Sequence, residues 1–210
     1  MINIVIVDDH AILRRGLTQI ISESSDMKVV GEAENSAQAL RLVREQPCDV
    51  MLLDISLPDR NGIETLKLVR KEVPKLQVLM LSMHPENQYA LRSLKAGAAG
   101  YLTKQSAASQ LVSAIRQVNS GRKYVTPAVA EELANSIDRD SERPPHELLS
   151  MREYQTMCMI ASGKSLTDMA GQMSLSVKTV SVYRARVLEK MRLKNNAEIT
   201  HYAIKNELVD

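Results

Sequence analysis

The sequence predicts a doubly wound α/β domain with a five-stranded parallel sheet, followed by a smaller all-α domain. Three observations support this fold class. Short apolar runs alternate five times with amphipathic stretches over the first 120 residues, a proline-containing acidic segment then interrupts the pattern, and no strand signal follows Ser150. A chain of 210 residues is long for one domain and comfortable for two.

The five apolar runs are short and rich in β-branched residues, which is typical of buried parallel strands. They span residues 3–7, 29–33, 50–54, 77–82 and 100–103. Stretches with apolar residues at helical spacing follow them, near 11–21, 36–46, 63–72, 87–96 and 107–119. Strict alternation implies right-handed crossovers, so helices are expected on both faces of the sheet.

The segment after this pattern predicts a linker. Residues 125–149 hold two basic residues against six acidic ones, and the segment contains Pro127, Pro144 and Pro145. A short helix near 127–136 followed by a flexible stretch is expected. The predicted domains are therefore 1–121, a linker at 122–147, and 148–210.

The last domain has the signals of four helices. Ser150 with Glu153, and Ser165 with Asp168, have the spacing of capping boxes, in which the first side chain caps a helix and the second bonds back. Ser176 is placed to cap a third helix that ends near Met191. A fourth helix is expected over 197–206.

Polar residues end four of the five predicted strands. The carboxyl ends of parallel strands meet at one edge of a sheet, where functional groups gather. Three carboxylates at this edge would repel one another, and a hard divalent cation relieves that repulsion; Mg²⁺, which keeps several waters, fits best. The residues are Asp8 and Asp9, then Asp54, Ser82, Thr103 and Lys104.

This set predicts phosphoryl chemistry. Asp54 is placed as a nucleophile that accepts a phosphoryl group, with Mg²⁺ held by Asp9 and Asp54 and assisted by Asp8 and the Ser56 carbonyl. Lys104 can pair with the phosphoryl group as a point charge, and the Ser82 hydroxyl can donate to it. A phosphatase of the haloacid dehalogenase type is the enzymatic alternative. It requires a second acid two residues after the nucleophile, where this chain has Ser56.

The motifs resemble the receiver domains of two-component systems. They are Val5-Ile-Val-Asp-Asp-His10, Leu52-Leu-Asp-Ile-Ser-Leu-Pro58 through Gly62, Leu81-Ser82 and Gly100-Tyr-Leu-Thr-Lys104. The resemblance covers residues 1–120 and implies a CheY-like fold with a sensor histidine kinase as phosphodonor. It also implies that Ser82 and Tyr101 couple the phosphoryl state to the surface around the last two strands.

The third helix of the last domain carries a local excess of positive charge. Residues 176–194 hold six basic residues against one acidic residue, which favours a polyanionic partner. A helical wheel places Val180, Val187 and Met191 on the core face. Small or basic side chains cover the opposite face and its flanks, where they can meet bases and phosphates of DNA. These are Lys178, Thr179, Ser181, Val182, Ala185, Arg186 and Lys190.

A basic amphipathic helix is often only a solvated helix, but a short connection joins this one to a preceding capped helix, as in a helix-turn-helix. Leu149-Ser-Met-Arg-Glu153, Lys178-Thr-Val180 and Lys190-Met191 resemble the LuxR-type four-helix output domain. The whole chain is therefore similar to NarL/FixJ-family response regulators. Lys164 and Asp168-Met169 depart from the common pattern, and the reading face lacks long hydrogen-bonding side chains.

That resemblance implies promoter DNA as a partner, a homodimer formed after phosphorylation, and control of transcription in which RNA polymerase is a further candidate partner. The alternative is a DNA-binding protein with a relic receiver, which the complete acidic set disfavours. No secretory pattern and no apolar run of about 20 residues is present, so a soluble cytoplasmic protein without a membrane partner is expected. Cys48 and Cys158 are expected to be reduced packing residues. His10 is expected to face solvent at a helix start, and no zinc site is predicted.

Overall fold

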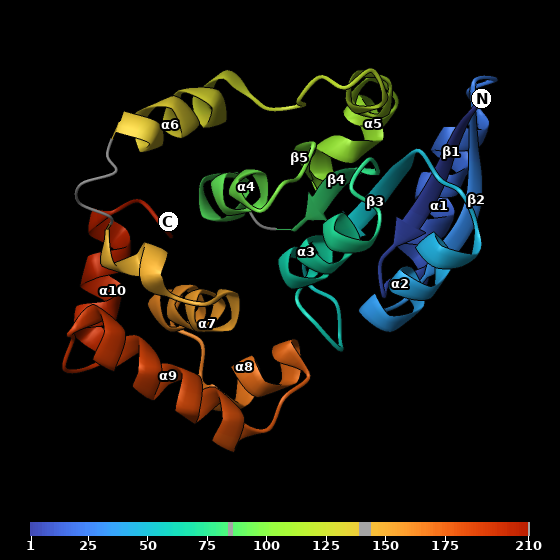
Figure 1. The fold of residues 1–210 in the computed structure, drawn as a ribbon. Coiled ribbons are helices and arrows are strands. Elements are labelled where there is room, and N and C mark those ends of the chain that lie inside the picture. The colour runs from blue at the N-terminus through green and yellow to red at the C-terminus, as the bar shows by residue number, and fades with distance from the viewer. Residues whose placement is uncertain (84–85, 139–143, 210) are drawn as a thin grey trace. The chain divides into compact units, whose positions relative to one another are not determined.

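The computed structural model describes residues 1–83, 86–138 and 144–209. The chain divides into two compact units, Met1–Glu132 and Leu133–Asp210, which are considered separately. The first unit is a five-stranded parallel sheet in the order β2-β1-β3-β4-β5, with helices between the strands (Figure 1). The predicted doubly wound α/β fold is confirmed.

Three of the five strands have the predicted bounds, and the two others begin earlier. The strands are β1 Ile2–Val7, β2 Met27–Ala33, β3 Val50–Asp54, β4 Gln77–Ser82 and β5 Gly100–Thr103. Every residue of β3 is buried, as expected for the central strand of a sheet with both faces covered. Its last residue is Asp54, so the fold itself brings this carboxylate to the carboxyl edge of the sheet.

The helices of this unit are α1 Ala11–Ser22, α2 Ser36–Glu45, α3 Gly62–Glu72, α4 Glu86–Lys95 and α5 Lys104–Asn119. α5 begins three residues before the predicted position, because the Thr103 side chain accepts a hydrogen bond from Ser106 N and caps the helix. α1 and α5 pack on each other, and one apolar core joins them to alternate residues of the strands. The earlier start of α5 places Lys104 in its first turn, beside the strand ends.

The predicted linker begins with residues that the first unit binds. Tyr124 N donates to Ala99 O at 2.9 Å, and Tyr101 N donates to Tyr124 O at 3.2 Å, so Tyr124 extends the sheet beside β5 as a single bridge. The helix expected near 127–136 is α6, Pro127–Asp138. Part of the remaining linker, residues 139–143, lies outside the described residues.

The second unit contains a helix-turn-helix. After a short 3-10 helix, η1 Pro145–Leu148, come α7 Met151–Ala161, α8 Leu166–Met173, α9 Val177–Met191 and α10 Asn196–Lys205 (Figure 1). Both predicted capping boxes are present, and Ser176 caps α9 as expected. α7 packs on α9 and α10, and α8 packs on α9. Among the described residues, no helix has the length and apolar character needed to cross a membrane.

Candidate functional site

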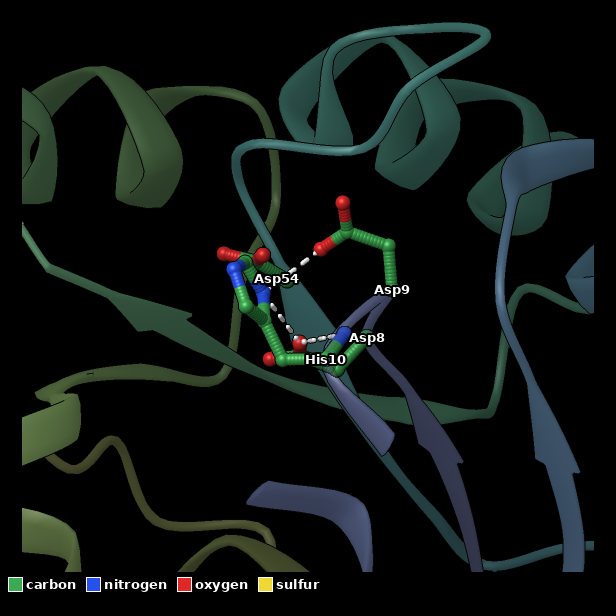
Figure 2. Close-up of side chains that lie close together, drawn as sticks. All are labelled: Asp8, Asp9, His10 and Asp54. Atoms are coloured by element: carbon green, nitrogen blue, oxygen red, sulfur yellow. Dashed lines mark hydrogen bonds and ion pairs between the residues drawn. The ribbon is translucent and has the colours of Figure 1, made fainter. Parts of the chain in front are cut away.

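An acidic pocket lies at the carboxyl edge of the sheet. Asp8 and Asp9 follow β1, Asp54 ends β3, and their side chains converge with that of His10 (Figure 2). One potential ligand atom from each of these four residues can be chosen such that all lie within 4.8 Å of one another. The structure therefore brings together the three predicted carboxylates.

Asp54 is buried, and both of its carboxylate oxygens accept a hydrogen bond. Ser56 N donates to Oδ1 at 3.1 Å, and Lys104 Nζ donates to Oδ2 at 2.9 Å. Burial raises the pKa of Asp54; Lys104 opposes this rise, whereas the negative charge of Asp8 adds to it. Keeping the buried Asp54 carboxylate charged therefore costs free energy, and an added cation would lower that cost.

Lys104 is the internal counter-ion of the pocket. Its Nζ lies 2.7 Å from Oδ2 of Asp8 as well as 2.9 Å from Oδ2 of Asp54, and its side chain is 5% exposed. Burial lowers the pKa of Lys104, but the two carboxylates outweigh this effect and leave the pKa above its usual value. Lys104 therefore stays charged and ties α5 to the ends of β1 and β3.

The pocket fits a hard divalent cation. One ammonium faces three carboxylates, so negative charge remains in excess around the fully buried Asp8 and Asp54. Asp9 is about one-third exposed, which leaves the pocket open to solvent on that side. Carboxylate oxygens close together are the ligands that Mg²⁺ prefers, with water filling its other positions. Ser56 lies in the loop directly after Asp54, as the proposed carbonyl ligand must.

Ser82 and Tyr101 occupy the two strands beyond Asp54. Ser82 ends β4 and is fully buried, and β4 pairs with β3 such that Asp54 lies opposite Leu81, the neighbour of Ser82. Tyr101 is buried in β5 and lies opposite Met80. Ser82 thus reaches the same edge of the sheet as Asp54, whereas Tyr101 lies two residues before the carboxyl end of β5.

Two residues that the sequence pattern does not assign to the pocket, His10 and Arg14, contact its acidic pair. His10 was expected to face solvent; its side chain is 64% exposed, but Nδ1 lies 2.7 Å from Asp9 Oδ1 and 3.1 Å from Asp8 Oδ1. Arg14 is buried and donates to the Asp8 carbonyl at 2.6 Å while its other nitrogens bind Glu32 and Glu34. Its position on the buried stripe of α1, with Leu17 and Ile21, was the available signal, since a buried arginine needs partners.

The loop after Asp54 is held against the strand by a close backbone approach. Gly62 N donates to Ile55 O at 2.8 Å, and Asn61 caps α3 by accepting from Ile63 N. A Cβ on Gly62 would lie 2.0 Å from the Asp54 carbonyl oxygen, far inside van der Waals contact. Only glycine is therefore compatible with this packing, and this position helps to fix the backbone of Asp54.

A second candidate site is the exposed face of α9. Val180, Val187 and Met191 are buried on its inner side, as the helical wheel predicts. Thr179 is half-buried, and the remaining predicted contact residues are exposed: Lys178, Ser181, Val182, Ala185, Arg186 and Lys190. Val182 is 44% exposed, so an apolar side chain lies in the middle of a basic and hydroxyl-bearing surface.

Lys190 differs from the other predicted phosphate contacts. Its Nζ donates to Glu153 Oε2 at 2.7 Å, and the same oxygen accepts from Ser150 N at 2.8 Å in the capping box of α7. Burial raises the pKa of Glu153, but the bonds from Lys190 and Ser150 outweigh it and lower the pKa below its usual value. The ammonium thus already has a partner within the unit, because Glu153 is nearly fully buried and needs a cation.

The fold and the two sites define a class of protein: a phosphoryl-accepting α/β domain joined to a helix-turn-helix domain. Residues 4–116 match the family described as response regulator receiver domain, and residues 147–203 match bacterial regulatory proteins, luxR family. The chain belongs to the response regulators with a LuxR-type DNA-binding domain.

Two similar proteins and one similar solved structure align with nearly the whole chain. The chain is 38% identical to the response regulator UvrY of Escherichia coli (strain K12), over 99% of this chain and 96% of that protein. It is 34% identical to the response regulator GacA of Pseudomonas aeruginosa, over 100% of this chain and 99% of that one. RcsB of Salmonella enterica serovar Typhimurium, solved bound to promoter P1flhDC with the phosphomimetic BeF3−, matches with a TM-score of 0.62 and 25% identity, over 96% of this chain and 97% of that chain.

Proposed function

We propose that Asp54 is the phosphoryl acceptor of this response regulator, and that its phosphorylation controls the binding of promoter DNA by α9. The observation that carries the proposal is the position of the buried Asp54 carboxylate, which ends the central strand and is bonded to Lys104 at 2.9 Å. A rigid strand end holds the nucleophile, and a fixed ammonium lies where charge on a transferred phosphoryl group would need compensation.

The transfer reaction uses the side chains of this pocket, a bound Mg²⁺ and a phosphohistidine of a sensor kinase. A carboxylate oxygen of Asp54 forms a bond to phosphorus as the phosphorus–nitrogen bond of the phosphohistidine breaks, and the electron pair stays on the leaving imidazole, which takes up a proton. Lys104 pairs with the phosphoryl oxygens, and the Ser82 hydroxyl donates to them. Mg²⁺, when held by Asp9, Asp54, Asp8 and the Ser56 carbonyl, neutralises charge on the phosphoryl oxygens.

We further propose that α9 reads DNA through a close approach rather than through long side chains. Ser181, Val182 and Ala185 are small and exposed in the middle of the face, so they can lie against base edges and the thymine methyl group. Lys178, Thr179 and Arg186 flank them and are assigned to phosphates. Because Lys190 is bonded to Glu153, we assign it to the orientation of α9 rather than to a phosphate.

The remaining partners follow from this assignment. A homodimer on DNA is proposed, with α10 as the pairing element, because Ile204 on that helix is 55% exposed. We also propose a cytoplasmic location, which would give the protein access to promoter DNA and to the kinase that phosphorylates Asp54, and RNA polymerase as the recipient of the signal.

Enrichment of genomic DNA fragments by the purified full chain tests the proposal. The experiment compares the protein with Mg²⁺ alone and with Mg²⁺ and beryllofluoride, an aspartyl-phosphate mimic, and repeats both arms with Asp54→Ala. The proposal is supported if defined fragments are enriched only with the mimic and if this enrichment is lost in Asp54→Ala. Equal enrichment in both arms would retain DNA binding but contradict its control through Asp54.

A further inference from the structure

Arg14 is a buried cation of α1 whose hydrogen-bond partners come from outside that helix. Its Nη1 donates to the Asp8 carbonyl at 2.6 Å, just past the end of β1. Its Nε donates to Glu32 of β2 at 3.1 Å, and its Nη2 donates to Glu34 at 2.7 Å. A guanidinium presents its donors in one rigid plane, so a single arginine can hold several acceptors at fixed mutual positions. Arg14 therefore fixes the end of β1 relative to the end of β2.

The charge of Arg14 is already balanced outside the acidic pocket. Glu32 and Glu34 place two carboxylates on one guanidinium, and their side chains are 39% and 60% exposed. Arg14 binds Asp8 through the backbone carbonyl, whereas Lys104 binds the Asp8 carboxylate inside the pocket. Arg14 thus acts on the pocket through the geometry of the backbone, and Lys104 acts on it through charge.

The backbone of Asp8 is bonded on both sides. Asp8 N donates to Ala33 O at 3.0 Å, and the Asp8 carbonyl accepts from Arg14. This carbonyl belongs to the planar peptide group that leads to Asp9, so a bond that fixes its oxygen also fixes the direction in which the chain enters Asp9. The Asp9 side chain is 34% exposed, so the packing around it leaves it partly free. Its direction into the pocket therefore depends on the peptide that Arg14 holds (Figure 2).

We propose that Arg14 is a positioning residue for phosphoryl uptake: it holds the Asp8–Asp9 peptide so that the Asp9 carboxylate faces Asp54 across the pocket. The inference rests on the proposed function, because it concerns the same pocket. Without the bond from Arg14 the peptide gains freedom to rotate, and Asp9 spends part of its time outside the pocket. The affinity for Mg²⁺ and the rate of phosphoryl uptake should then fall together.

The test measures Mg²⁺ affinity of the full chain by calorimetry and its free energy of unfolding by denaturant titration. Arg14→Met keeps the apolar stem of the side chain and removes all three bonds. Arg14→Lys keeps the charge but lacks the planar fork, so it isolates geometry at constant charge. The control for charge is Arg15→Met, at the exposed neighbouring position. The control for stability is Val43→Ala, which shortens a buried side chain in the last turn of α2, toward the opposite edge of the sheet.

Mg²⁺ affinity should fall at least about tenfold in Arg14→Met, since outer-shell partners of a metal change its affinity by 10–100-fold. It should also fall in Arg14→Lys, although the net charge is unchanged. The direction separates positioning from electrostatics, because removal of a positive charge alone strengthens the binding of a cation. Arg15→Met should therefore not weaken Mg²⁺ binding, and Val43→Ala should lower only the stability.

Unchanged or tighter Mg²⁺ binding in both Arg14 variants would overturn the inference. An equal loss of affinity in Val43→Ala would overturn it as well, because the effect would then follow from stability alone. These results leave the site of phosphorylation untouched. A phosphoryl group mapped to a residue other than Asp54 would instead contradict the proposed function, whatever the affinities of the Arg14 variants.

Discussion

Lys104 Nζ donates a hydrogen bond of 2.9 Å to Oδ2 of Asp54, which joins the first turn of α5 to the end of β3. The same ammonium lies 2.7 Å from Asp8, so one buried lysine balances part of the charge of two buried carboxylates. A phosphoryl group added to Asp54 would give Lys104 a new partner at the same strand edge. The contact therefore links the chemistry of β3 to the position of α5.

Removal of the Lys104 charge should strengthen Mg²⁺ binding while weakening phosphoryl uptake. In Lys104→Met, Asp54 and Asp8 lose their shared cation, so they gain more from a divalent ion. We expect Mg²⁺ affinity to rise at least about tenfold, or about 1.4 kcal/mol, as measured by calorimetry. The control is Lys71→Met, at an exposed lysine of α3. Weaker Mg²⁺ binding in Lys104→Met than in the control would contradict the role of Lys104 as a competing cation.

Gly62→Ala should disturb the backbone of Asp54. The added Cβ would lie 2.0 Å from the Asp54 carbonyl oxygen, and a buried backbone atom cannot move aside as a flexible side chain can. We expect a loss of about 1–3 kcal/mol in the free energy of unfolding, measured by denaturant titration, together with slower phosphorylation. Gly16→Ala is the control, because an added Cβ there meets nothing within 4 Å. Equal effects of the two changes would refute the close approach.

The Glu153–Lys190 contact should make the stability of the second unit depend on acid pH. The pKa of Glu153 is lower in the folded state than in the unfolded chain, so its contribution is present above the usual glutamate value of about 4.3 and is lost as the pH falls through the folded pKa. Glu153→Gln should lower the free energy of unfolding by about 1–3 kcal/mol near neutral pH. It should also reduce the fall of the melting temperature as the pH becomes acidic. Glu189→Gln, at an exposed position on α9, should leave the profile unchanged. If the melting temperature of Glu153→Gln falls at acid pH as steeply as that of the unchanged protein, Glu153 is not the source of this pH dependence.

The salt dependence of DNA binding should separate Lys178 from Lys190. Lys178 is exposed and assigned to a phosphate, so Lys178→Met should weaken binding on all sequences and reduce the slope against log salt by about one. Lys190 is bonded to Glu153, so Lys190→Met should leave that slope unchanged and act through stability. Fluorescence anisotropy with a labelled fragment at several salt concentrations measures both slopes. If the slope against log salt fell by about one in Lys190→Met as well, the Lys190 ammonium would be assigned to a DNA phosphate instead.

Sequence patterns predicted the fold and the convergence of the acidic residues for a physical reason. Parallel strands with buried residues on both faces are marked by short β-branched runs, and their ends share one edge of the sheet, so Asp8, Asp54 and Lys104 could be grouped without coordinates. The capping boxes at Ser150 and Ser165 were equally local, since each needs only four residues.

Contacts made by long or rotatable side chains were not accessible in this way. A helical wheel gives the direction of Lys190 but not its partner, which lies 37 residues earlier on another helix. Rotamer choice, which sequence spacing does not determine, turns His10 over Asp9. Tyr124 pairs with β5 through its backbone, which leaves no side-chain pattern to detect.

Chemical mapping of the phosphorylated residue tests the central claim most directly. The full chain is phosphorylated by a small-molecule phosphodonor with Mg²⁺ and reduced with borohydride, which converts an aspartyl phosphate to homoserine, and its peptides are analysed by mass spectrometry. We predict homoserine at position 54 and none in Asp54→Ala. Homoserine at position 8 or 9, or undiminished phosphate uptake by Asp54→Ala, would contradict it.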